Sequence, residues 1–142
     1  MSNVDAVAAS GNQAQAGLLA AVPLVGRILI AAIFLISGFG KITDPAGTIG
    51  YIQMVGLPFP AVGYGLAVLT EVAGGIALVL GFQTRAVALI LAVFSIATAL
   101  VFHNALGDMN QFIHFFKNVA MAGGLLQIVA FGGGRLSLDA RR

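Results

Sequence analysis

Four long apolar segments constrain the fold of this 142-residue chain more than any other feature. They cover residues 22–40, 61–81, 85–102 and approximately 111–131. A helix needs roughly 20 apolar residues to cross a ~30 Å hydrocarbon core, so each segment fits one membrane crossing. Charged residues make up only 8% of the chain, too few to cover the surface of a soluble domain. The sequence therefore predicts an all-α membrane protein with a bundle of four transmembrane helices.

The regions outside these segments differ in character. Residues 1–20 are rich in Ala, Gly, Asn and Gln, which predicts a disordered N-terminal tail before a transmembrane domain over 21–132. Three glycines at 132–134 end the last helix, and residues 133–142 form a basic tail. In the linker over 41–60, Asp44 before Pro45 is typical of a helix start, and Gly56 of a helix end. We expect a short amphipathic helix between helices 1 and 2, in the membrane interface or folded against the bundle.

The positive charges are unevenly divided between the two sides of the predicted bundle. Four crossings put both termini on one side, together with five arginines, at positions 27, 85, 135, 141 and 142. The other side has two lysines, Lys41 and Lys117. Because cytoplasmic loops carry an excess of Lys and Arg, both termini are predicted to be cytoplasmic.

Ionisable residues inside the predicted helices are the main functional signal, since such residues in lipid are usually paired or functional. Glu71 lies near the middle of the second helix, and Arg27 lies within the first. Counting from the outer helix ends gives a depth difference of roughly 4–5 Å at ~1.5 Å rise per residue. A Glu71–Arg27 pair is therefore geometrically possible, and Lys117 is the other candidate partner of Glu71. Thr70 and Gln127 are further possible hydrogen-bond partners.

A second polar cluster lies toward the outer side. Three of its members, His114, Lys117 and Asn118, share a helix face at i, i+3 and i+4. One interpretation is a polar pocket for the head of an apolar molecule such as a quinone, with its ring among Phe102, Phe112, Phe115 and Phe116. The alternative is that the lysine and histidines extend to the interface while the phenylalanines face lipid. The candidate ligand-binding residues are Glu71, Lys117, Asn118, His114, His103, Lys41 and Arg27.

Several classes of chemistry lack the residues they need. The chain has no cysteine, which excludes disulfides, thiolate metal sites and iron–sulfur clusters. Its two histidines, eleven residues apart across a loop, match no ligand motif, so no metal site is expected. No basic run with interleaved aromatics favours nucleic-acid binding. No self-sufficient catalytic set is visible, and no covalent cofactor is expected.

Three stretches resemble the DoxX family of small four-helix membrane proteins. The first is Gly38-Phe39-Gly40-Lys41-Ile42 with Asp44-Pro45. The second is Gly56-Leu57-Pro58 followed by Glu71-x-x-Gly74-Gly75 and Leu80-Gly81. The third is Phe116-Lys117-Asn118 with Gly123-Gly124-Leu125-Leu126. They occur in the family's order within residues 22–131. The resemblance implies a multi-pass protein of the bacterial inner membrane, with site candidates at Lys41, Glu71, Lys117 and Asn118.

The resemblance also implies a link to membrane redox chemistry, since some relatives belong to a thiosulfate–quinone oxidoreductase or to assemblies that protect against oxidative stress. We therefore expect an accessory subunit of a quinone-linked or oxidative-stress system, with the bilayer and either another membrane subunit or a second copy as partners. Two alternatives remain open. One is a purely structural or assembly subunit of a larger membrane complex. The other is a small proton-coupled transporter that uses Glu71.

Overall fold

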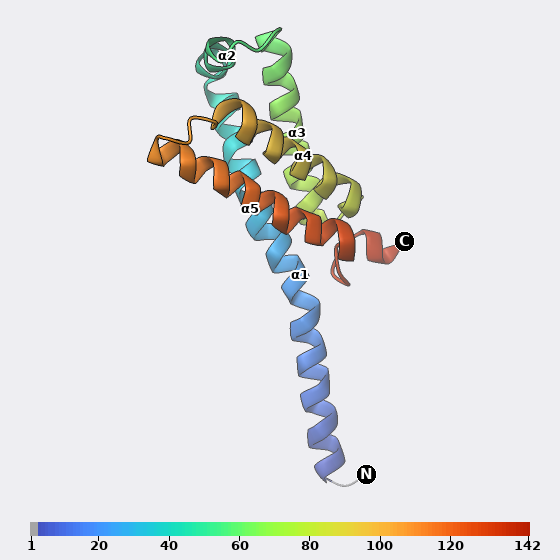
Figure 1. The fold of residues 1–142 in the computed structure, drawn as a ribbon. Coiled ribbons are helices and arrows are strands. Elements are labelled where there is room, and N and C mark those ends of the chain that lie inside the picture. The colour runs from blue at the N-terminus through green and yellow to red at the C-terminus, as the bar shows by residue number, and fades with distance from the viewer. Residues whose placement is uncertain (1–2) are drawn as a thin grey trace.

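The structure, a computed structural model, describes residues 3–142. Within this range the chain forms α1 (Asn3–Thr43), α2 (Pro45–Met54), α3 (Pro60–Leu80), α4 (Thr84–Phe102), α5 (Met109–Phe131) and a 3-10 turn at Asp139–Arg141, with no strand (Figure 1). By length and composition, α1, α3, α4 and α5 can each cross a membrane. The prediction of an all-α protein with four spans and a short helix between the first two is confirmed.

Helix α1 is much longer than one crossing. Its 41 residues correspond to about 60 Å of helix, and its N-terminal half projects away from the other helices (Figure 1). The described side chains of residues 11–19 are exposed, and Ala20 is the first half-buried residue. The structure thus gives residues 3–20 as helix where composition predicts disorder, because an alanine-rich segment extends an existing helix without a new nucleation cost. The domain limits remain a prediction.

The helices pack as two pairs, α1 with α3 and α4 with α5, joined mainly through α3 and α4. Close approach within the first pair depends on small residues, as is usual between membrane helices. A Cβ atom added at Gly75 would lie 2.7 Å from Leu35 Cδ2. The buried core includes Ala31, Leu78 and Leu125. This pairing leaves space between the two pairs on the side where α2 lies.

Helix α2 has the capping that the sequence predicts. The Asp44 carboxylate accepts a hydrogen bond of 2.9 Å from the Gly47 amide, and Pro45 occupies the first turn. The chain turns away just after the helix, at Gly56, whose φ of +81° suits glycine. On the inner face Ile52 is buried, and α2 packs against α3. The short helix therefore folds against the bundle, one of the two expected positions.

The C-terminal segment folds back onto the turn between α3 and α4. The amides of Leu138 and Asp139 donate to the carbonyls of Leu80 and Gly81, at 3.1 and 3.0 Å. The Asp139 carboxylate caps α4 by accepting from the Thr84 amide at 2.7 Å and from the Thr84 hydroxyl at 2.6 Å. These hydrogen bonds hold the pKa of Asp139 below its usual value. Hydrogen bonds thus hold the basic tail against the turn between α3 and α4.

Arg27 belongs to the same end of the molecule. Its side chain is only 1% exposed. The guanidinium donates to the carbonyls of Leu78 and Val79 at 3.0 and 3.2 Å, and also to that of Leu136. The last carbonyls of a helix lack partners within the helix, so Arg27 satisfies the C-terminal end of α3 and ties it to the returning chain. Its position is explained by this structural role.

Candidate functional site

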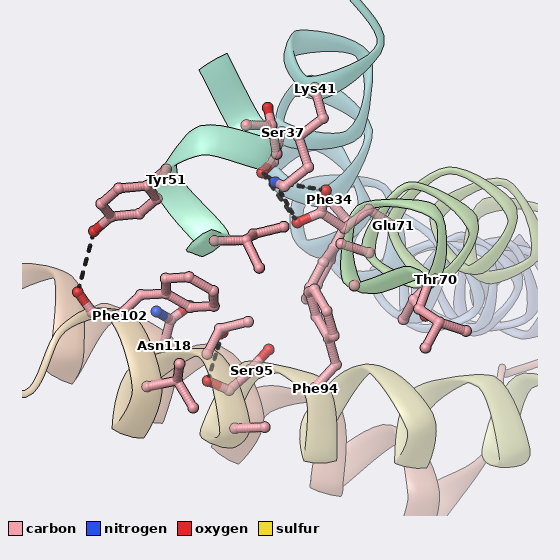
Figure 2. A pocket seen from close by; sticks show the side chains of 18 of the residues that line it. Phe34, Ser37, Lys41, Tyr51, Thr70, Glu71, Phe94, Ser95, Phe102 and Asn118 are labelled. Atoms are coloured by element: carbon pink, nitrogen blue, oxygen red, sulfur yellow. Dashed lines mark hydrogen bonds and ion pairs between the residues drawn. The ribbon is translucent and has the colours of Figure 1, made fainter. Parts of the chain in front are cut away.

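A cavity of about 660 Å³ lies between the two helix pairs, with α2 along one side (Figure 2). All five helices contribute to its wall. Its lining is mostly apolar and includes the phenylalanine rings of Phe34, Phe94 and Phe102. The polar lining residues are Ser37, Lys41, Asp44, Thr48, Tyr51, Thr70, Glu71, Ser95, Thr98, His103, Lys117 and Asn118. Five of the seven predicted ligand-binding residues therefore line one cavity.

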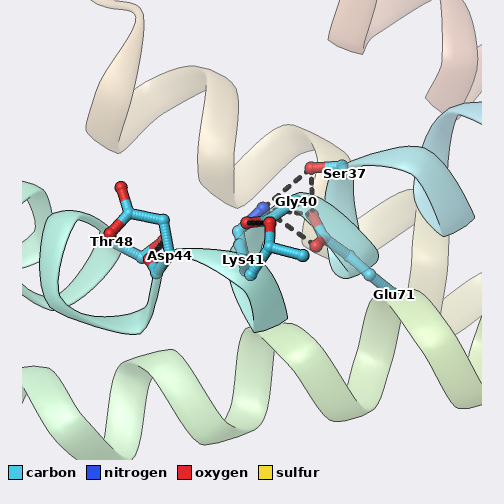
Figure 3. Close-up of polar contacts among 7 residues, drawn as sticks. Ser37, Gly40, Lys41, Asp44, Thr48 and Glu71 are labelled. Atoms are coloured by element: carbon cyan, nitrogen blue, oxygen red, sulfur yellow. Dashed lines mark hydrogen bonds and ion pairs between the residues drawn. The ribbon is translucent and has the colours of Figure 1, made fainter.

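An ion pair between Lys41 and Glu71 forms part of the wall made by α1 and α3. The Lys41 Nζ atom lies 3.0 Å from Glu71 Oε1 and 2.9 Å from Oε2. Ser37, one turn before Lys41, accepts from Nζ at 2.7 Å and donates to Glu71 Oε1 at 3.0 Å (Figure 3). The Glu71 side chain is 6% exposed and that of Lys41 is 23% exposed. The three side chains form a closed hydrogen-bonded triad.

This triad corrects the predicted partners of Glu71. Arg27 bonds instead to the end of α3, and Lys117 Nζ lies 2.9 Å from His114 Nδ1. Thr70 lines the cavity, whereas Gln127 is on the exposed side of α5. The predicted Glu71–Arg27 pair is therefore wrong. The depth difference was counted from helix ends taken to lie at the same level, and the ends of α1 and α3 are not level.

A glycine allows the triad to form. Gly38 is buried next to Ser37, and a Cβ atom there would lie 2.7 Å from Val72 Cγ2 and 3.1 Å from Glu71 Cβ. No larger residue lets α1 approach α3 this closely without a shift of neighbouring atoms. The approach puts Ser37 and Lys41 within hydrogen-bond distance of Glu71.

Asn118 lies on the opposite wall, on α5, and is 7% exposed. Its side chain reaches the cavity surface (Figure 2), and none of the side-chain hydrogen bonds among residues 3–142 involves its amide. The nearby hydroxyls of Ser95 and Thr98 donate to carbonyls of their own helix, at 2.8 and 3.0 Å. The amide of Asn118 therefore retains donors and an acceptor on this wall.

The two histidines meet at the rim of the cavity. Their rings stack with centroids 5.1 Å apart, and His103 Nδ1 lies 2.9 Å from Gln111 Oε1. His103 and Lys117 line the cavity, while His114 lies behind Lys117. No group of three or more side chains suited to hold a metal ion occurs among the described residues. His103, His114 and Lys117 thus lie together, and of these three His103 and Lys117 line the cavity.

Comparison with known proteins identifies the family. The DoxX family profile matches residues 22–104. The chain belongs to the DoxX family. The inner membrane protein YqjF of Escherichia coli K12 is 39% identical over 119 residues, which cover 82% of this chain and 88% of YqjF. The inner membrane protein YphA of the same organism is 37% identical over 123 residues, covering 83% of this chain and 88% of YphA. No solved structure matches the chain significantly.

The DoxX match contains the ion pair and α2, whereas Asn118 lies beyond it on α5. Two of the cavity residues in the matched region that the sequence did not indicate, Ser37 and Tyr51, form hydrogen bonds between helices or to the ion pair. Ser37 has a signal, its position four residues before Lys41. No sequence signal indicates Tyr51, because its position depends on a contact between α2 and α4. Its hydroxyl donates to the Phe102 carbonyl at 3.4 Å.

The expected aromatic surroundings are partly wrong. Among the four phenylalanines proposed to surround a ligand ring, Phe102 lines the cavity. Phe112 and Phe116 are exposed, and they pack on each other with centroids 4.7 Å apart. Phe34 and Phe94 from α1 and α4 line the cavity instead. The face of α5 that carries Phe112 and Phe116 is directed outward because Asn118, Ala122 and Leu125 define its buried face.

Proposed function

We propose that this DoxX-family inner membrane protein binds an uncharged lipophilic molecule of the quinone class in the cavity, with the polar head at the triad of Ser37, Lys41 and Glu71. The observation that carries the proposal is an ion pair set into the wall of an otherwise mostly apolar cavity. Cavities of about 300–1,000 Å³ with a few convergent polar groups are typical small-molecule sites. A volume of about 660 Å³ fits a ring with part of its tail.

The charges of the lining favour a neutral ligand. Lys41 and Lys117 are balanced by Glu71 and Asp44, so the formal charge of the lining is zero when His103 is neutral. Moreover, Lys41 is already neutralised by direct contact with Glu71. An anionic head group would therefore meet a carboxylate with no excess of positive charge, and a cationic one would compete with Lys41.

We further propose that the protein works as an accessory subunit of a membrane redox system, together with another membrane protein or a second copy of itself. A bound quinone or quinol would exchange electrons with that partner. We place both termini in the cytoplasm, so the cavity, on the side of α2 and Lys117, faces the outer surface. The distribution of five arginines and two lysines supports this orientation.

The test is ligand binding to the purified protein in lipid nanodiscs. The probe is a benzoquinone with a decyl tail, offered in oxidised and reduced form, and decyl phosphate is the anionic comparison. Binding is followed by native mass spectrometry and by thermal stabilisation, which rises with ligand concentration over Kd. We expect saturable binding of the uncharged probe and weaker binding of decyl phosphate.

Variants locate the site. Glu71→Gln and Lys41→Met should each weaken binding of the reduced probe tenfold or more, since a hydrogen bond to a charged group contributes about 1.5–3 kcal/mol. Gln127→Leu is the matched control, because Gln127 is a polar residue on the exposed side of α5. Failure of both forms to bind would overturn the proposal, as would equal affinity in all three variants. Tighter binding of decyl phosphate would refute the neutral-ligand argument.

A further inference from the structure

We infer that the cavity prefers the reduced, hydroxyl-bearing form of its ligand, a quinol, over the oxidised dicarbonyl form. This inference rests on the proposed function and adds to it the redox state that the site selects. It follows from the hydrogen-bonding capacity that remains in the triad, and from the unpartnered amide of Asn118 on the opposite wall.

The triad has no spare donor. An ammonium group carries three N–H donors, and Lys41 Nζ lies within 3.0 Å of three acceptors, Ser37 Oγ, Glu71 Oε1 and Glu71 Oε2. The single hydroxyl proton of Ser37 is directed to Glu71 Oε1. A ligand carbonyl, which can only accept, would therefore have to displace one of these bonds.

The triad does have a spare acceptor. An ionised carboxylate has about four lone-pair sites, and Glu71 uses three of them, two on Oε1 and one on Oε2. The remaining site on Oε2 can accept a hydrogen bond from a ligand hydroxyl without loss of any existing bond. Hydrogen bonds to an ionised acceptor are roughly twice as strong as neutral ones. The triad thus favours a ligand group that donates a hydrogen bond.

Asn118 provides the second contact. Asn118 as a residue is 7% exposed, and its amide lines the cavity without a hydrogen-bond partner in the described chain. The amide can accept from a hydroxyl or donate to a carbonyl, so it contributes affinity without selecting the redox state. Glu71 and Asn118 lie on opposite sides of the cavity (Figure 2). A ring with two oxygens on opposite edges matches this arrangement.

The experiment compares the decyl benzoquinone with its quinol, kept reduced under nitrogen, on the full-length protein in nanodiscs. In the wild type we expect the quinol to bind at least tenfold more tightly. Asn118→Leu should weaken both forms and keep the preference. Glu71→Gln should abolish or reverse it, because the amide that replaces the carboxylate adds N–H donors for a carbonyl. Gln127→Leu should change neither affinity nor preference.

Ser37→Ala is a second, milder variant in case Glu71→Gln does not fold. Loss of the serine oxygen frees one Lys41 proton for a carbonyl, so the preference should shrink. The inference is overturned if the wild type binds the quinone as tightly as the quinol, or if the preference survives in every folded variant among Glu71→Gln and Ser37→Ala. If both forms bind equally well, only this inference fails. If neither form binds, the proposed function itself fails.

Discussion

Removing one member of the Lys41–Glu71 pair should destabilise the protein more, per residue changed, than removing both. The perturbation is a double-mutant cycle of Lys41→Met and Glu71→Met, which replaces each ion with an apolar side chain of similar length. Two unit charges about 3 Å apart attract by roughly 5–6 kcal/mol at an effective dielectric constant of about 20. Desolvation of both ions offsets most of this attraction. We expect a net coupling of about 1–3 kcal/mol.

The two single variants should differ. Lys41→Met leaves a carboxylate that is 6% exposed with Ser37 as its remaining donor, which should cost about 2–3 kcal/mol in the free energy of unfolding. Glu71→Met leaves Lys41, which lies in the last turn of α1 and is 23% exposed. Its ammonium can turn toward the outer interface, so this variant should lose only about 1–2 kcal/mol.

Unfolding by SDS titration in mixed micelles measures the four free energies at a single pH. A control cycle pairs Glu71→Met with Lys117→Met, because Lys117 contacts His114 rather than Glu71. The control cycle should be additive within about 0.5 kcal/mol. If the losses in the Lys41–Glu71 cycle also add within that range, the pair is not energetically coupled and the argument is refuted.

Further predictions concern packing, the C-terminal segment and orientation. Gly75→Ala should lower the free energy of unfolding by about 1–3 kcal/mol through overpacking. The control Gly65→Ala, in open space on the same helix, should be neutral or stabilising by up to about 1 kcal/mol. Equal losses of stability in the two variants would contradict the α1–α3 packing. Arg27→Met should lower the free energy of unfolding by about 2–4 kcal/mol, because the carbonyls at the end of α3 lose their donor. A loss below about 0.5 kcal/mol would contradict the role of Arg27 at the end of α3. Asp139→Asn should lower the melting temperature at neutral pH. Hydrogen bonds from Thr84 depress the pKa of Asp139 in the folded protein. The stabilisation by the Asp139 carboxylate is therefore complete above the unfolded-state pKa of about 3.9 and disappears as pH falls through the lower folded-state pKa. A difference in melting temperature between wild type and Asp139→Asn that grows in acid would refute the cap. Green fluorescent protein fused to either terminus should fluoresce, and alkaline phosphatase there should be inactive; the reverse would invert the topology.

The helices themselves were predictable because local signals define them. Membrane spans require about 20 apolar residues, and glycine or proline marks their ends, as at Gly132 after α5. Asp44 and Pro45 likewise locate the start of α2. The return of the C-terminal segment was not predictable. It depends on Asp139 meeting the start of α4, some 55 residues earlier, and no local pattern encodes that contact.

For the site, the sequence indicated the residue types but not their pairing. The depth estimate took Gly40 as the outer end of the first helix, yet α1 continues to Thr43, and Gly38 lies level with Glu71. Side chains on a helix also tilt toward its N-terminus. In the proposed orientation the Lys41 side chain is therefore directed back into the membrane, toward Glu71, rather than outward.

The Lys41–Glu71 ion pair should contribute little to stability and much to ligand binding. A buried ion pair can often be replaced by apolar residues with little loss of stability, so packing alone gives little reason for Lys41 and Glu71 in this wall. A double variant, Lys41→Met with Glu71→Met, should therefore fold with a loss of no more than about 2 kcal/mol. The same variant removes every charge from the triad and should bind neither form of the decyl probe measurably. If the double variant instead binds as the wild type does, the ion pair acts only between the helices, and the ligand head must lie elsewhere in the cavity.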